Sequence, residues 1–454
     1  MFAAQAKLSA ATLCFALFAV GAPCARAQAS AAQSRLEQAA AAIAAERLGE
    51  AEQQLNAILK AAPGDVLALN LLGTVRAKQN RLDEAEALFQ RAVRADRRFV
   101  GAHMNLAYLH LLRGAPEKTA AELREVLRLD PSNADAADKL ARLVCPQPSG
   151  AEECARLVEG ARRAGRLTQG LALLAGDAYL KKGDPARAEE MYLLVLGGSA
   201  SSAEAQLGMA LVSQARGDAR TAALYITRAR DSAGDSHETL YRLAVAALKA
   251  GMYDVARETL ERATALAPAE PAYRVALGAA WLKKSELFEA ERAFREALRL
   301  RADDPRALMY LGYTLLKQKK VAEARGLLEK SARGDATSAE TFYYLGLALQ
   351  EQGEDAAAVE QFATAVRLLP TFARAHVALG SVFLKLKQYA RAQAALEAGV
   401  KLDPDDTKAH YNLARLYALL KDPKRARAEM EIVERLKSEG KTQDEEAQAP
   451  PGPR

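Results

Sequence analysis

Hydrophobic residues follow a helical spacing along almost the whole chain. They recur at i, i+3, i+4 and i+7 in stretches of about a dozen residues, which is typical of amphipathic α-helices. Two kinds of break separate the stretches and alternate along the chain. The first holds a residue suited to the left-handed conformation that ends a helix: Asn80, Gly114, Gly183, Gly217, Gly251 and Gly353. The second holds a proline, which cannot continue a helix: Pro63, Pro131, Pro268, Pro370 and Pro404. The pattern predicts a series of helical hairpins.

The hairpins repeat every 34 residues, as the spacing from Gly278 to Gly312 illustrates. In one repeat a small residue stands at position eight (Gly278), an alanine at position twenty (Ala290) and a large apolar residue at position twenty-four (Phe294). We predict that the two small residues let the helix backbones approach closely. We predict that the large residue fills the space against the next hairpin. Eleven copies are recognisable in nearly unbroken phase, which unrelated alanine-rich helices would not maintain.

This pattern closely resembles the tetratricopeptide repeat family, over about nine-tenths of the chain that follows the N-terminal leader. The resemblance implies an all-α fold, a right-handed superhelical solenoid of about eleven to twelve helical hairpins. We assign residues 32–133 to N-terminal repeats and 169–437 to C-terminal repeats. Residues 438–454 are polar, acidic and proline-rich, and their composition predicts a disordered tail.

Residues 1–27 have the pattern of a secretory signal peptide. Lys7 precedes an apolar stretch, Leu8 to Val20, and a small-x-small pattern ends at Ala27. We predict cleavage after Ala27, a periplasmic or secreted protein, and no transmembrane segment in the mature chain. A lipoprotein acylated at Cys24 would need a small residue where Pro23 stands. A retained membrane anchor is the other alternative, for which the apolar stretch is short.

Residues 134–168 depart from the repeat and are predicted to form a degenerate, cysteine-marked hairpin. Its first helix ends in the sequence Cys145-Pro146-Gln147-Pro148, its second lacks the repeat signature, and the phase slips by one residue. Removal of the leader leaves two cysteines in an exported protein, where disulfides form readily. We predict a Cys145–Cys154 disulfide. Two free buried thiols are the alternative.

Composition and motifs favour binding over catalysis. The net charge of +6 is spread over 454 residues with no basic stripe, which argues against nucleic-acid binding. Of the five histidines, His376 and His410 share position four of their repeats, a packing position in the family, and no His/Cys/Asp/Glu cluster has metal-ligand spacing. No nucleotide-binding loop or nucleophile elbow occurs. We therefore predict no enzymatic activity, no cofactor and no metal site.

The resemblance also implies a binding surface, because positions two, five, nine, twelve and thirteen of the first helix line the groove in this family. Mapped onto this chain, these positions give aromatic and apolar candidates together with a ladder of lysines: Tyr108, Tyr241, Met309, Tyr313, Tyr343, Tyr411, Lys249, Lys283, Lys317 and Lys385. Such a trough suits a peptide with apolar anchors and acidic character. A tyrosine at position five and a lysine at position thirteen are also common structural choices, since lysine there complements the helix dipole.

The sequence favours a non-catalytic scaffold or adaptor that binds protein or peptide segments along the groove. One alternative is an assembly subunit of an envelope export or pilus machine, with other envelope-complex subunits as partners. Another is a sugar-polymer-binding module, since exposed aromatic rings in a groove could stack on sugars.

Overall fold

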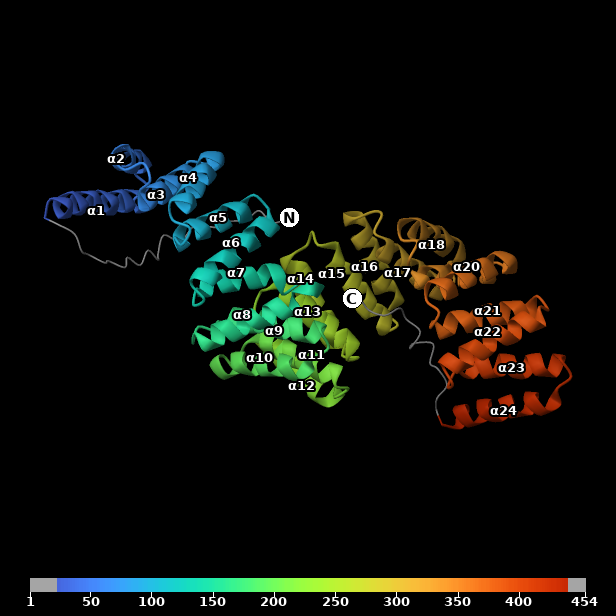
Figure 1. Cartoon of the computed structure of the whole chain (residues 1–454). Coiled ribbons are helices and arrows are strands. Elements are labelled where there is room, and N and C mark those ends of the chain that lie inside the picture. Colours follow the sequence, from blue (N-terminus) through green and yellow to red (C-terminus); the bar gives the residue numbers. More distant parts are fainter. Residues whose placement is uncertain (1–22, 440–454) are drawn as a thin grey trace. The chain divides into compact units, whose positions relative to one another are not determined.

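The computed structural model describes residues 23–439, and every regular element in this range is helical. The predicted tail lies outside this range from Gly440 onward. The predicted leader lies outside it except for residues 23–27, which belong to the first helix. The chain divides into two compact units, residues 1–198 and 199–454 (Figure 1). We describe each unit by itself.

Unit 1 contains five helical hairpins, each made of two consecutive helices that pack on one another. Their bounds are α1 (Pro23–Ala44), α2 (Leu48–Ala61), α3 (Val66–Lys78), α4 (Leu82–Ala95), α5 (Val100–Leu112), α6 (Pro116–Leu129), α7 (Ala134–Val144), α8 (Ala151–Arg163), α9 (Gln169–Lys181) and α10 (Pro185–Gly198). A short 3-10 helix, η1 (Pro148–Gly150), lies between α7 and α8.

Unit 2 contains seven further hairpins. Their bounds are α11 (Ala203–Ala215), α12 (Ala219–Ser232), α13 (His237–Lys249), α14 (Tyr253–Leu266), α15 (Pro271–Lys283), α16 (Leu287–Leu300), α17 (Pro305–Lys317), α18 (Val321–Gly334), α19 (Ala339–Glu351), α20 (Asp355–Leu368), α21 (Ala373–Lys385), α22 (Tyr389–Leu402), α23 (Thr407–Leu419) and α24 (Pro423–Ser438). Within each unit the hairpins stack in chain order. The described residues thus confirm the predicted all-α solenoid. None of the described helices is both long and apolar enough to cross a membrane.

The helix starts reproduce the 34-residue period. From α3 onward the first helices begin at Val66, Val100, Ala134, Gln169, Ala203, His237, Pro271, Pro305, Ala339, Ala373 and Thr407. Each step is 34 residues except the step from Ala134 to Gln169, which is 35. Polar caps fix many of these starts, as when the Asp304 carboxylate accepts a hydrogen bond from the Ala307 amide at 3.0 Å.

The turn inside each hairpin adopts the predicted left-handed conformation. Six glycines have positive φ angles, including all five glycines predicted there, and Asn80 also has φ 62°. The same conformation is held by Ser285, Lys319, Lys387 and Lys421, which the sequence pattern did not single out. Side chains other than glycine and asparagine are strained in this region, so the turn geometry is imposed by the flanking helices in these four hairpins.

The large residue at position twenty-four packs on two neighbours. As predicted, it lies against the next hairpin: the Phe294 ring of α16 stacks on Tyr310 of α17, with ring centroids 5.4 Å apart. It also lies on the small residue at position eight of its own hairpin: a Cβ built on Gly346 would stand only 2.6 Å from the Phe362 ring, and one on Gly278 only 2.5 Å from Phe294. All four aromatic residues at position twenty-four face a glycine in this way, and so do Leu328 and Leu396. The pair at positions eight and twenty-four therefore sets the spacing of the two helices within each hairpin.

Candidate functional site

In unit 2 the first helices of successive hairpins approach one another more closely than the second helices do. We therefore call the exposed side of the first helices the inner side of the stack. The pairs α11 and α13, α15 and α17, and α21 and α23 approach each other directly across successive hairpins. Nine of the ten predicted groove residues lie on these first helices. The tenth, Tyr108, belongs to α5 in unit 1.

Three of the predicted residues in the middle of unit 2 are buried by their neighbours. Tyr313 and Tyr343 both pack on Tyr344, with ring centroids 4.6 Å and 5.2 Å apart, and Tyr343 also lies 5.1 Å from Phe372. Met309 is 7% exposed. Burial raises the pKa of Tyr343 and, more strongly, that of Tyr344. These side chains stabilise the stack and present only their edges to a ligand.

Cationic side chains lie over the edges of this aromatic cluster. The Arg374 guanidinium stands 5.6 Å from the Tyr343 ring centroid and 5.4 Å from that of Phe372. The Lys317 ammonium stands 6.0 Å from the Tyr313 ring. These are cation–π distances, so the aromatic rings hold positive charge at the inner side of α17 and α21.

Side chains from hairpins that are not adjacent approach one another here. Burial lowers the pKa of Lys283 on α15, and the positive charge of Arg374 on α21, three hairpins further along, adds to the lowering. Burial also raises the pKa of Tyr241 on α13, while Arg306 on α17 opposes this rise. We call the surface formed by Tyr241, Lys283, Arg306, Lys317 and Arg374 the inner surface of unit 2. All of its residues except Arg306 are partly buried, and its cations come from three hairpins.

Carboxylates also reach this region. Glu340 contributes to raising the pKa of Tyr310, and Asp406 to raising that of Tyr343, in both cases behind the larger effect of burial. Arg306 and Arg374 occupy position two of their first helices, and neither was among the predicted residues. Position two belongs to the groove positions that the resemblance implies, so the repeat phase alone would have found them.

The remaining predicted residues of unit 2 occupy more open places. Tyr241 packs on Tyr273 with ring centroids 4.9 Å apart. Tyr411 is 47% exposed, and Lys249 is exposed at the end of α13. The Lys385 ammonium is bound to the Asp355 carboxylate at 2.7 Å. The predicted lysine ladder is thus not uniform, since Lys385 is neutralised by a carboxylate of the preceding hairpin.

In unit 1, Tyr108 on α5 is bound to α7, the first helix of the next hairpin. Its hydroxyl donates a 2.5 Å hydrogen bond to the Asp135 carboxylate, and the Lys139 ammonium lies 5.1 Å from its ring. Burial, helped by Asp135, raises the pKa of Tyr108. The Tyr108 hydroxyl and one face of its ring therefore both contact side chains of α7.

The cysteine hairpin, formed by α7, η1 and α8, brings Cys145 and Cys154 together. Their Sγ atoms lie 2.03 Å apart, the length of a disulfide bond, and both residues are buried. The same hairpin contains the one-residue slip in the repeat phase. Oxidation of the pair stays a prediction, and the geometry places no obstacle to it.

Two of the histidines at position four connect their hairpin to the preceding turn. The two ring nitrogens of His410 lie 2.6 Å from Glu429 Oε2 and 3.0 Å from the Pro404 carbonyl oxygen, and His103 makes the same pair of contacts with Glu122 and Arg97. Both rings are buried. Within residues 23–439, no group of three or more His, Cys, Asp or Glu side chains is arranged to hold a metal ion.

Comparison with known proteins identifies the repeats. A family profile described as "Tetratricopeptide repeat" matches residues 36–97, 70–134, 207–271, 241–287, 289–340, 343–392 and 377–440. Together these regions cover well over half of the chain. They leave out residues 135–206, which contain the cysteine hairpin. No match was found among curated proteins.

Several solved structures resemble the chain at low identity. A chain of the APC/C hetero-tetramer Cut9-Hcn1 is 14% identical over 88% of this chain and 92% of that chain, with a TM-score of 0.47. Yeast Tom70 is 15% identical over 93% and 94%, with a TM-score of 0.43. PilF of Pseudomonas aeruginosa is 22% identical over 48% and 96%, with a TM-score of 0.42. Values this low carry no argument about function.

Proposed function

Because this chain belongs to the tetratricopeptide repeat family, which is typical of protein-interaction scaffolds, we propose that it is a non-catalytic adaptor whose inner surface of unit 2 binds an acidic segment of a partner protein. The observation that carries this proposal is the positive charge on this surface: the Arg374 guanidinium and the Lys317 ammonium lie 5.6 Å from the Tyr343 ring centroid and 6.0 Å from that of Tyr313.

Cations in a partly buried place are poorly solvated and interact strongly with negative charge. A carboxylate of a partner would gain charge-assisted hydrogen bonds from them. The stacked arrangement of first helices gives a partner segment a surface that runs along several hairpins. The surface thus favours an extended or helical segment that carries glutamate or aspartate among apolar residues.

The aromatic rings favour a protein ligand over a sugar polymer. Stacking on a sugar requires an open ring face, but Tyr313 and Tyr343 pack on Tyr344 and all three rings are buried. Tyr411, at 47% exposure, offers an isolated ring. An assembly role in an envelope export or pilus machine is compatible with the same surface, and identification of the bound partner would separate this role from a general adaptor.

We also propose that the protein acts in the periplasm or outside the cell. The support is the leader pattern that ends at Ala27, together with the paired cysteines, which suit an oxidising compartment. Mass spectrometry of the protein recovered from the periplasm of an expressing bacterium tests this proposal. A mature chain that begins at Gln28 is expected. Retention of residues 1–27 in a cytoplasmic fraction would contradict it.

Binding is tested with a labelled peptide of about fifteen residues that alternates glutamate with leucine, against a matched peptide in which lysine replaces glutamate. We expect the acidic peptide to bind, and Lys283→Glu or Arg374→Glu to weaken its affinity by tenfold or more, since each lost charge-assisted bond is worth about 1.5–3 kcal/mol. Lys330→Glu, at an exposed position of the second helix α18, is the matched control. Equal affinity for both peptides, or equal loss in the control, would reject the inner surface.

A photo-reactive residue placed at position 241 or position 330 then extends the test to natural partners. We expect adducts from the position on α13 and none from the position on α18. Tyr313 and Tyr343 are unsuitable for such substitutions, because both are buried in the stack and their replacement would disturb folding.

A further inference from the structure

The last hairpin, α23 and α24, exposes an apolar face. The equivalent face of each of the three preceding hairpins is buried. At position twenty-four, Leu328, Phe362 and Leu396 are completely buried, whereas Met430 in α24 is partly exposed. Within the described residues no further hairpin follows to cover Met430.

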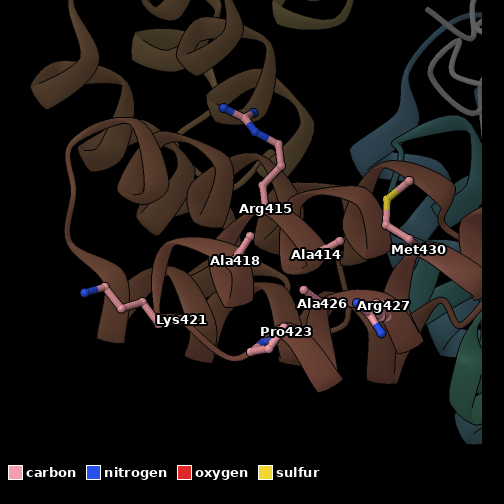
Figure 2. A pocket seen from close by; sticks show the side chains of 8 residues that line it. All are labelled: Ala414, Arg415, Ala418, Lys421, Pro423, Ala426, Arg427 and Met430. Atoms are coloured by element: carbon pink, nitrogen blue, oxygen red, sulfur yellow. The ribbon is translucent and has the colours of Figure 1, made fainter.

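A pocket of about 670 Å³ opens on this face. In Figure 2 the small side chains of Ala414, Ala418 and Ala426 lie between Lys421 at one end and Met430 at the other. Pro423 completes the apolar lining. We call this surface the end face.

Positive charge surrounds the end face. Arg415, Lys421 and Arg427 line the pocket and are exposed, and within residues 23–439 none of them forms an ion pair. Lys421 holds a φ of 59°, in a conformation that glycine adopts without strain at the same turn of other hairpins. An occupant of the end face must therefore carry negative charge next to small apolar groups. A second copy presenting the same face would bring three positive charges against three.

We propose that residues 440–454 of the same chain cover the end face, with Asp444, Glu445 and Glu446 at its basic rim. This segment begins directly after α24 and combines the acidic triplet with Ala447, Ala449 and three prolines. The lengths agree. From Ser438 back to Arg427 the helix rises about 16 Å at 1.5 Å per residue. Six or seven extended residues span about 20–24 Å at most, so the triplet reaches Arg427 if the chain doubles back along α24.

Hydrogen exchange of the backbone amides in residues 414–430, measured on the full chain, tests the proposal. A short tether gives an effective concentration of about 1 mM, so a segment with a dissociation constant near 0.1 mM protects these amides about tenfold. We expect the tail variant D444K/E445K/E446K and the rim variant R415E/K421E/R427E each to exchange about tenfold faster. The combined variant, in which the charges are exchanged between the two sides, should regain protection.

A synthetic peptide of residues 440–454, added to the tail variant at about 1 mM, should also restore protection. Lys401→Glu on α22 is the control for charge reversal on a neighbouring helix and should change nothing. The milder Lys421→Gly removes one rim charge and relaxes the turn, so any faster exchange in it cannot come from backbone strain. Unchanged exchange in the tail variant would overturn the proposal. Protection that rises with protein concentration would overturn it in favour of a second copy.

Discussion

Replacement of Gly346 by alanine tests the pairing of positions eight and twenty-four. The new Cβ would stand 2.6 Å from Phe362 Cε1, 2.7 Å from Cδ1 and 2.9 Å from Cζ. Carbon atoms in contact prefer about 3.5–4.0 Å, so the ring must move by almost 1 Å. It has little room to do so, because Phe362 is completely buried and its ring also packs on Tyr343.

Two effects of opposite sign decide the outcome. Overpacking of a buried site costs about 1–3 kcal/mol, whereas glycine to alanine inside a helix gains about 1 kcal/mol. Gly326 in α18 isolates the second effect, because a Cβ there meets no atom within 4 Å. We therefore expect Gly326→Ala to stabilise the protein and Gly346→Ala to lie about 1–3 kcal/mol below it in free energy of unfolding.

The cost of the Gly346 substitution should disappear when Phe362 is first replaced by alanine, because the three atoms nearest the new Cβ all belong to the Phe362 ring. Leucine would not serve, since a Cβ on Gly312 or Gly380 would still stand 2.7 Å from Leu328 Cγ or 2.6 Å from Leu396 Cγ. In the Phe362→Ala background, Gly346→Ala should stabilise the protein by up to about 1 kcal/mol. Urea unfolding followed by circular dichroism compares these four variants with the wild type. Hydrogen exchange of α19 and α20 localises the effect within the repeat array. If Gly346→Ala stabilises the protein with Phe362 in place as much as Gly326→Ala does, the pairing argument is wrong.

Three further predictions concern other contacts. Thiol titration of the denatured, unreduced protein should find no free thiol in the cysteine hairpin, and two reactive thiols would exclude the disulfide. The Arg76 guanidinium, helped by a hydrogen bond from Gln79, lowers the pKa of Glu52 from 4.5 to about 2. The ion pair of Glu52 with Arg76 therefore stabilises the fold fully above pH 4.5, and this stabilisation is lost as the pH falls to about 2. Glu52→Gln should lower the free energy of unfolding by about 0.2–1 kcal/mol at pH 7, and in thermal unfolding its difference from wild type should disappear near pH 2. His410→Ala should cost about 1–3 kcal/mol, because it leaves the half-buried Glu429 without its partner, while His376→Ala, which breaks one bond to a carbonyl oxygen, should cost less in the same assay.

The fold could be predicted from the sequence because residues within each hairpin mark where its helices end and where they pack. Small residues at position eight and helix-ending residues at position fifteen recur in phase, and periodicity of this kind is a local signal. The prediction for the large residue at position twenty-four named only the next hairpin, which Phe294 contacts through Tyr310, and missed the contact with the glycine of its own hairpin. A side chain on the second helix can make both contacts, and its sequence position alone does not show the second.

The inner surface was harder to predict than the fold. Positions five and thirteen identify residues on the correct helices, but burial depends on which rings are neighbours across hairpins. Tyr343 is buried because Tyr344 and Phe372 surround it, whereas Tyr411, at the same position of a later repeat, is 47% exposed. The effect of Arg374 on the pKa of Lys283 depends on how the four hairpins from α15 to α22 stack, which no single repeat encodes.

The residues that build the hairpins and those that face a ligand are different sets. Membership of the repeat family therefore determines the fold but not the charge of the inner surface. Positions eight and twenty-four must fit one another within a hairpin, so a substitution at one of them constrains the other. Position two has no such partner inside the hairpin and can hold alanine, glutamate or arginine, as Ala272, Glu340 and Arg374 do. The charge of the inner surface can therefore vary without loss of the fold. In this chain it is the arginines and lysines at positions two and thirteen, and not the repeat itself, that favour an acidic partner.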